Sequence, residues 1–179
     1  MSSEPADAGA DPRLPKRIYL DTQFLFAYLV DTDRDHSDAV RTAKELRVVH
    51  RAGLASGFAS ALVLSELAWQ LAGSFFDMTH GKGAWHRSDK PRAHETVRSE
   101  VARSIGLLLR EPWLRIASAD EEACSMYPVF MHRFPLCSAD QAHLVIAATS
   151  GMDAILTHDR HFQSLEDSPV PIVSYRIDQ

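Results

Sequence analysis

Short apolar runs alternate with longer amphipathic stretches along most of the chain. The apolar runs have the length and composition of strands, and they cover residues 17–20, 54–60, 114–117, 154–157 and 170–173. The stretches between them repeat their apolar residues at helical spacing. These predicted helices cover residues 22–29, 36–51, 61–76, 93–110, 120–132 and 138–150.

Capping and breaking residues set the expected ends of these elements. Asp21 can cap the first helix, and Ser138 is expected to cap the last one, which Gly151 ends. Pro128 is expected to kink or split the helix over 120–132. Residues 77–92 contain two glycines, a proline and many polar side chains, so we expect a loop there.

The order of these elements predicts the fold class. Strands that alternate with helices indicate a mostly parallel sheet with helices on both faces, which is a three-layer α/β/α sandwich. The length of 179 residues suits one such domain. Residues 1–15 are rich in Ala, Asp, Gly and Pro, and we expect a disordered arm there, followed by a domain over 16–179.

Charge and cysteine content restrict the function and the location. With 24 acidic and 19 basic residues the formal net charge is −5, so bulk charge cannot hold a nucleic acid. Binding of RNA would need a local basic patch and bound metal. No apolar run approaches the roughly 20 residues of a membrane helix, and the start lacks the features of a signal peptide. Two cysteines outside any CxxC pair suit reduced thiols, so we expect a cytoplasmic protein without a membrane partner.

Four acidic residues occupy the ends of predicted strands or the first turns of predicted helices. Asp21 closes the first strand, and Asp159 follows the strand over 154–157. Glu66 lies in the helix after the second strand, and Asp140 lies in the first turn of the helix that starts near residue 138. The carboxyl ends of parallel strands share one edge of a sheet, where ligands bind in this fold class. We therefore expect these four side chains to converge.

Convergence of four carboxylates favours a bound divalent cation. Like charges at close range disfavour ionisation, and a hard cation such as Mg²⁺ or Mn²⁺ reverses that penalty with oxygen ligands. Such ions can activate water for attack on a phosphodiester. Taken singly, each acid could instead be a helix cap, a helix-dipole partner, a turn residue or a solvated residue. The residues alone leave these readings open.

Other metal sites and catalytic motifs fit the sequence poorly. Asp31, Asp33 and Asp35 alternate as in a calcium loop, but His36 stands at the glycine position and Thr42 at the glutamate position. The histidines lack the spacing of zinc motifs. The chain has no Gly-rich phosphate loop, and no serine has a His–acid partner at recognisable spacing.

Supporting residues are expected beside the acids. His143 lies one turn after Asp140, where it could touch the site or pack as an ordinary helix histidine. Thr157 could orient Asp159 or a water molecule, or serve only as a strand-end residue.

One segment combines basic and aromatic side chains, including Trp85. Such a mixture can follow phosphates and stack a base, although a solvated loop is the alternative. The candidate substrate-binding residues are Lys82, Arg87, Lys90 and Arg92.

At the four acids the chain resembles the PIN-domain nucleases, including the VapC-type toxins. The first motif reads IYLDTQFLFAYL, with Gln23 in place of the usual Asn, and the second reads SALVLSELAWQL. The third reads SADQAHLVIAA, in which Asp140 and His143 match the frequent Asp-x-x-His pattern. The fourth reads DAILTHDRHF and matches Thr-x-Asp-x-x-Phe. The resemblance covers residues 16–173.

The resemblance implies an α/β/α nuclease that depends on Mg²⁺ or Mn²⁺ and cleaves RNA. Asp21, Asp140 and Asp159 would hold the metal, with Glu66 as a further ligand or a water-positioning acid. An antitoxin protein and a second copy of the chain are candidate partners. Residues 77–95 are longer than the usual connection and are expected to be an insertion. The alternatives are an inactive PIN-like module that binds RNA or protein, and a nuclease that acts on DNA.

Overall fold

The computed structural model describes residues 15–176 of the chain. Apart from residue 15, the arm expected over 1–15 lies outside the described residues. Within this range no helix is both long enough and apolar enough to span a bilayer.

Five parallel strands form one sheet in the order β3-β2-β1-β4-β5. The strands are β1 (Arg17–Leu20), β2 (Ser56–Ser60), β3 (Leu114–Ala117), β4 (Ala154–Leu156) and β5 (Ile172–Val173). Strand β1 is central, and its Ile18 pairs with Gly57 of β2 and Ala154 of β4. The expected parallel sheet is confirmed, and the ends of β1, β2 and β4 therefore lie at one edge.

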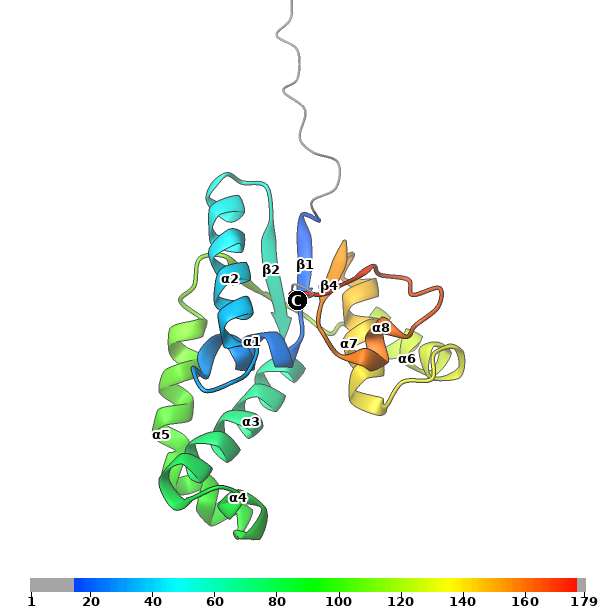
Figure 1. Ribbon diagram of the computed structural model, residues 1–179. Coiled ribbons are helices and arrows are strands. Elements are labelled where there is room, and N and C mark those ends of the chain that lie inside the picture. The colour runs from blue at the N-terminus through cyan, green and yellow to red at the C-terminus, as the bar shows by residue number, and fades with distance from the viewer. Residues whose placement is uncertain (1–14, 177–179) are drawn as a thin grey trace, which may run out of the picture.

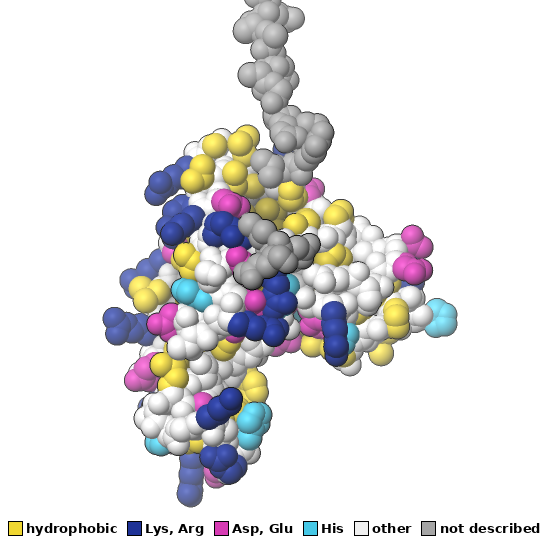
Figure 2. All heavy atoms as spheres, viewed as in Figure 1, with side chains coloured by type: hydrophobic (Ala, Val, Ile, Leu, Met, Phe, Trp, Pro, Cys, Tyr) yellow, Lys and Arg dark blue, Asp and Glu magenta, His cyan; other side chains and the backbone are white. Residues whose placement is uncertain are grey.

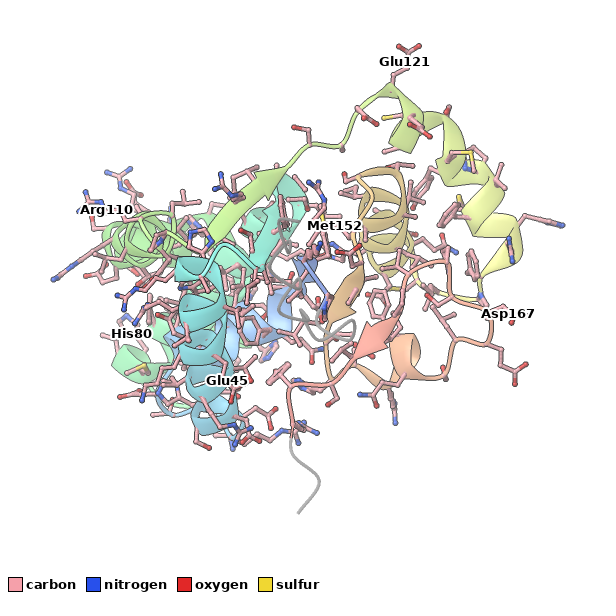
Figure 3. All side chains as sticks on the ribbon, turned by 90° about the horizontal axis from the view of Figure 1, so that it is seen from above. Glu45, His80, Arg110, Glu121, Met152 and Asp167 are labelled. Carbon is pink, nitrogen blue, oxygen red and sulfur yellow. The ribbon has the colours of Figure 1, made fainter. Side chains whose placement is uncertain are left out.

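Eight helices flank the sheet within the described residues (Figure 1). They are α1 (Thr22–Leu29), α2 (His36–Arg51), α3 (Ala61–His80), α4 (Ala84–Arg87), α5 (Lys90–Leu108), α6 (Glu121–Arg133), α7 (Ser138–Thr149) and α8 (Arg160–Gln163). Seen from above, α2 and α7 lie on opposite sides of the sheet (Figure 3). Right-handed crossovers explain this, because the chain steps one way from β1 to β3 and back from β3 to β4. The α/β/α sandwich is confirmed.

The prediction of a loop over residues 77–92 is wrong, because this segment is mostly helical. Helix α3 continues to His80, residues 81–83 turn the chain into α4, and residues 88–89 connect α4 to α5. Gly81 and Gly83 have φ angles of 91° and 77°, which explains the two glycines as turn residues rather than as the signs of a long loop. Pro91 stands in the first turn of α5, where a proline costs no hydrogen bond. Helices α3 and α5 thus form a hairpin that projects away from the sheet, with α4 at its tip (Figure 1).

Two smaller expectations also need correction. Pro128 does not split its helix, because α6 runs continuously from Glu121 to Arg133. Cys137, and not Ser138, is the N-cap residue of α7. Asp120 caps α6 through a 3.0 Å hydrogen bond from the backbone N–H of Ala123, which helps this helix to form despite its proline.

The packing of α7 on the sheet gives a stability prediction. Leu144 of α7 is fully buried, whereas Leu107 of α5 has 54% of its surface exposed. Replacing Leu144 with Ala should lower the free energy of unfolding by about 2–5 kcal/mol, because it leaves a cavity. Leu107→Ala should change it by less than about 0.5 kcal/mol. Urea denaturation of both variants measures the difference, and equal small effects would contradict the packing of α7.

Candidate active site

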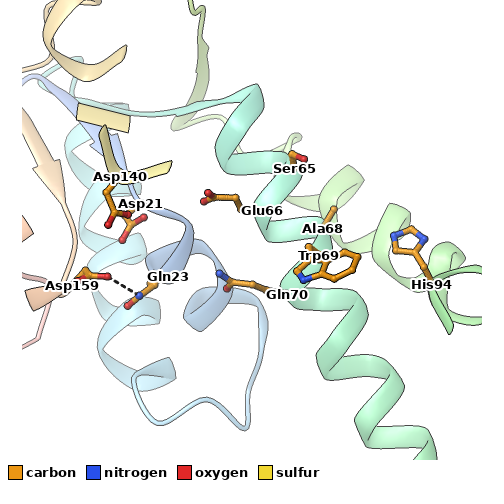
Figure 4. Close-up of a pocket in the computed structure, with 10 residues that line it drawn as sticks. All are labelled: Asp21, Gln23, Ser65, Glu66, Ala68, Trp69, Gln70, His94, Asp140 and Asp159. Carbon is orange, nitrogen blue, oxygen red and sulfur yellow. Dashed lines mark hydrogen bonds between the residues drawn. The ribbon is translucent and has the colours of Figure 1, made fainter. Parts of the chain in front are cut away.

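Asp21, Glu66, Asp140 and Asp159 line one pocket of about 650 Å³ at the carboxyl edge of the sheet (Figure 4). Asp21 follows β1 directly, and Asp159 follows the neighbouring strand β4. Glu66 reaches the pocket from α3, and Asp140 reaches it from the first turn of α7. The structure therefore brings together acids that are up to 138 positions apart in the chain, counted from Asp21 to Asp159.

Asp21 is the most buried of the four acids, with 7% of its surface exposed. The hydroxyl of Thr157 donates a 2.7 Å hydrogen bond to its Oδ2 atom. Burial raises the pKa of the Asp21 carboxyl above its usual range, and the charge of Asp159 acts in the same direction. The hydrogen bond from Thr157 opposes this shift. A buried carboxylate of this kind is stabilised by a nearby cation.

Thr157 also connects Asp21 to Asp159. Its Oγ1 atom accepts a 2.9 Å hydrogen bond from the backbone N–H of Asp159. The Asp159 carboxylate accepts the backbone N–H of His161 at 2.7 Å, which caps α8, and the amide of Gln23 at 3.2 Å. Gln23 therefore helps to orient an acid of the pocket, although it replaces the Asn that is usual in the first motif.

Glu66 is held by two donors on the same oxygen atom. The Nε2 atom of His143 lies 2.9 Å from its Oε2, and the hydroxyl of Thr22 lies 2.7 Å from it. The hydrogen bond from His143 lowers the pKa of Glu66, burial opposes that shift, and the bond from Thr22 adds to it. Glu66 is therefore an ionised acceptor beside Asp21.

A buried chain of hydrogen bonds extends from Glu66 into the core. The ionised carboxylate can only accept, so the Nε2–H group of His143 donates to it. The Tyr19 hydroxyl is hydrogen-bonded to Nδ1 of His143 at 2.9 Å and to the Ser60 hydroxyl at 2.8 Å. Burial raises the pKa of Tyr19, which keeps its phenol protonated. Ser60 in turn accepts the backbone N–H of Val63 and so caps α3, the helix that carries Glu66.

Asp140 is oriented by a side chain that the sequence did not indicate. The Sγ atom of Cys137 donates a 3.0 Å hydrogen bond to its Oδ2. This bond raises the pKa of the Cys137 thiol, so the thiol remains a donor. The Nδ1 atom of His161 lies 3.8 Å from Asp140 and 3.5 Å from Asp159. Neutral donors and histidines thus surround the acids.

A second group of buried charges anchors the loop that carries Asp159. Asp35 accepts two hydrogen bonds from Arg176, of 2.8 and 2.6 Å, and its Oδ2 atom lies 3.2 Å from Nε2 of His158. The hydrogen bond from Arg176 lowers the pKa of Asp35. His158 directly precedes Asp159, so this contact ties the pocket to the start of α2. The pairing joins residues 141 positions apart, and no local pattern could reveal it.

The donor set of the pocket suits a divalent metal ion. Carboxylate oxygens are the ligands that Mg²⁺ and Mn²⁺ prefer, and the raised pKa of the buried Asp21 would be relieved by such an ion. As the side chains lie, no three Asp, Glu, His or Cys groups of residues 15–176 form a ready-made metal site. In Figure 4 the carboxylates of Asp21, Asp140 and Asp159 nevertheless face one another across a small part of the pocket.

The basic residues singled out in the sequence lie away from the acid pocket, at the tip of the hairpin. Space-filling Figure 2 shows Lys and Arg side chains gathered there. Trp85 is buried, with 6% of its surface exposed, so its ring is not free to stack a base. Lys90 binds the carbonyl oxygen of Trp85 and lies 5.0 Å from the centre of its ring. The substrate-binding prediction for this cluster therefore rests mainly on Lys82, Arg87 and Arg92.

Comparison with known proteins identifies the family. The model of the PIN domain matches residues 18–167. The chain belongs to the PIN domain family. A search of curated proteins gave no match.

Solved structures similar to this PIN domain share its fold at low sequence identity. VapBC2 from Rickettsia felis, bound to a DNA fragment from its promoter, has a TM-score of 0.60 at 11% identity. The match covers 88% of this chain and 98% of the matched VapBC2 chain. VapC20 from Mycobacterium tuberculosis, a toxin that cleaves the sarcin–ricin loop, has a TM-score of 0.51 at 15% identity, with 82% and 93% covered. FitAcB from Neisseria gonorrhoeae has a TM-score of 0.54 at 16% identity, with 88% and 97% covered.

The buried charge of Asp21 predicts how stability depends on pH. A raised pKa means that the folded PIN domain binds this proton more tightly than the unfolded chain. The metal-free protein should therefore lose stability as pH rises through the folded pKa of Asp21. Asp21→Asn keeps an acceptor for Thr157 and removes the charge, so at neutral pH the metal-free variant should melt higher than the parent. Each kcal/mol gained corresponds to about 2–4 °C for a domain of this size.

Calorimetry of parent and variant, with and without Mg²⁺, measures this effect. Mg²⁺ should raise the melting temperature of the parent by mass action and that of Asp21→Asn much less. Asp31→Asn, at an exposed position, is the matched control and should behave as the parent does. A lower melting temperature of metal-free Asp21→Asn at neutral pH would show that Asp21 carries no unrelieved charge.

Proposed function

We propose that this PIN-domain protein is a Mg²⁺- or Mn²⁺-dependent endoribonuclease. The observation that carries the proposal is the convergence of four carboxylates, from four separate segments, on one pocket at the carboxyl edge of the sheet. Membership of a family of nucleases supports it. Asp21, Asp140 and Asp159 would hold the metal, and Glu66 would act as a further ligand or position the attacking water.

The residues of the pocket would have different roles in the hydrolysis of the phosphodiester bond. A bound divalent ion would supply charge neutralisation at the phosphate and make a water molecule more acidic. Both donors to Glu66 bind Oε2, which leaves its Oε1 atom as the acceptor for a proton of the attacking water. Water attacks phosphorus and the bond to the leaving oxygen breaks, so no covalent enzyme intermediate forms. Thr157 and His143 act as positioning residues, for Asp21 and Glu66 respectively.

A toxin of a toxin–antitoxin pair is the biological setting that we propose. The similar structures include VapBC2, FitAcB, and FitAB bound to a DNA fragment. By analogy, an antitoxin would cover the acid pocket and block RNA, and a homodimer is a second proposed assembly. We propose the cytoplasm as the location, where an RNA substrate is present. A gene for a small protein beside this one would support the pairing.

Metal dependence is the first test of the proposed activity. Purified protein should cleave RNA with Mg²⁺ or Mn²⁺ and lose that activity with a chelator. Asp140→Asn should lower the rate by roughly 100-fold or more, because a ligand to the catalytic ion is lost. Asp31→Asn is the control and should retain the activity of the parent. Cleavage that survives both the chelator and the acid substitution would rule out this mechanism, and preferential cleavage of DNA would correct the substrate class.

The hairpin tip gives a prediction about substrate binding. Lys82, Arg87 and Arg92 should contact phosphates, whereas Lys90 is engaged with Trp85. Replacing these three residues with Ala should weaken RNA binding and reduce the slope of log affinity against log salt by about 2, since each contact contributes about 0.7 for a single strand. Fluorescence anisotropy in Asp140→Asn, in which cleavage should be strongly slowed, measures both quantities.

A matched triple variant controls for the loss of positive charge. Its substitutions remove exposed cations outside the hairpin tip, and they are Lys44→Ala, Arg51→Ala and Arg110→Ala. The control should reduce the salt slope much less than the hairpin variant. Equal changes in the two triple variants would show that overall charge, and not the hairpin tip, determines binding.

A further inference from the structure

A half-exposed indole lies beside the acids of the pocket. Trp69 follows Glu66 by three residues on α3, so both side chains lie on neighbouring parts of one helix face. Trp69 has 51% of its surface exposed and lines the same pocket as the four carboxylates (Figure 4). A large aromatic surface left open to water in a polar pocket is a candidate contact for a ligand.

The indole of Trp69 packs against the buried ring of Trp85, which restricts its position. The ring of Trp85 contacts it edge to face, with 5.0 Å between the ring centres and an angle of 73° between the planes. Trp85 is fixed by Asp77, which accepts its backbone N–H, and by close packing on Gly73, where a Cβ atom would lie 3.2 Å from the indole. Trp69 is therefore a preorganised surface, and a ligand that stacks on it would lose little additional side-chain entropy.

Polar side chains accompany Trp69 in the pocket. Gln70 from α3 and His94 from α5 line the same pocket, and they offer an amide and an imidazole as donors and acceptors. Trp69 and Gln70 also line a second hollow of about 330 Å³, together with Phe26 and His86. These two residues thus stand between the acid pocket and a neighbouring depression toward the hairpin tip.

We propose that Trp69, Gln70 and His94 form a nucleobase subsite, in which one unpaired base stacks on the indole. Gln70 and His94 would contact the edge of that base. The phosphate next to it would lie at the carboxylates, and the strand would continue toward the hairpin tip. The inference rests on the proposed ribonuclease function and adds a substrate class, which is RNA with an unstacked base at the cleavage site. A duplex is a poor substrate because both faces of each base are already stacked.

Binding in a variant with strongly slowed cleavage tests the subsite directly. The probe is an unstructured RNA strand of mixed sequence, and its affinity is measured by anisotropy in the Asp140→Asn background. Trp69→Ala should weaken this affinity roughly 5- to 150-fold, the range expected for loss of one base–aromatic stack. Trp69→Phe should restore most of it, because a π face remains. Met78→Ala removes another exposed apolar side chain from α3, outside the pocket, and should bind as the background does.

Two further measurements separate stacking from a structural effect. The same RNA strand annealed to its complement should bind the background more weakly than the single strand, and Trp69→Ala should remove most of that preference. In the otherwise unaltered protein, Trp69→Ala should reduce cleavage of the single strand while its melting temperature stays close to that of Met78→Ala.

The outcomes distinguish the subsite from the function on which it rests. Absence of metal-dependent cleavage by the parent protein would overturn the ribonuclease and the subsite together. Cleavage by the parent with equal affinity and equal rate in Trp69→Ala would overturn the subsite alone. Loss of binding in Trp69→Ala without recovery in Trp69→Phe would also contradict stacking.

Discussion

Burial of negative charge at the end of the central strand is the constraint on which this structure depends. Strand β1 lies in the middle of the sheet, and its continuation places Asp21 where water can hardly reach it. The neighbouring strand β4 ends at the same edge and helices α3 and α7 begin near it, and they add three more acids. Among residues 15–176 the ionic partners of these acids are histidines. Hydroxyl, thiol, amide and imidazole donors thus hold the carboxylates while their negative charge remains available to a cation.

The sequence predicted the parts of the fold that depend on local patterns. The sheet, most of the helices and the positions of the four acids follow from runs of apolar residues and from the ends of those runs. The prediction of a loop over residues 77–92 was wrong because glycine and proline were counted as loop residues. Gly81 and Gly83 instead lie in one tight turn, and Pro91 fits the start of α5. The bond between Asp35 and Arg176 could not be predicted, because only the folded chain brings these residues together.

The side-chain contacts within the pocket also could not be predicted from local sequence patterns. The sequence left His143 undecided between packing in its helix and contact with the site, and the structure shows that it is buried and also bonded to Glu66. The sequence indicated Trp85 as the ring on which a base could stack, whereas in the structure Trp69 has the exposed ring. Burial of one indole and exposure of the other depend on how α3, α4 and α5 pack together. Glu66 and Trp69 share one continuous helix, so their backbone positions are fixed relative to each other.

The hydrogen bonds from Ser60 through Tyr19 and His143 to Glu66 form one buried series, and this has an evolutionary consequence. Tyr19 and His143 are each bonded on both sides, so a change at one position leaves its neighbours with an unmatched buried group. Stepwise substitution along the series would therefore pass through poorly folded intermediates. Among descendants of this sequence, these positions should be retained as a unit or replaced as a unit, while the exposed residues around them drift independently.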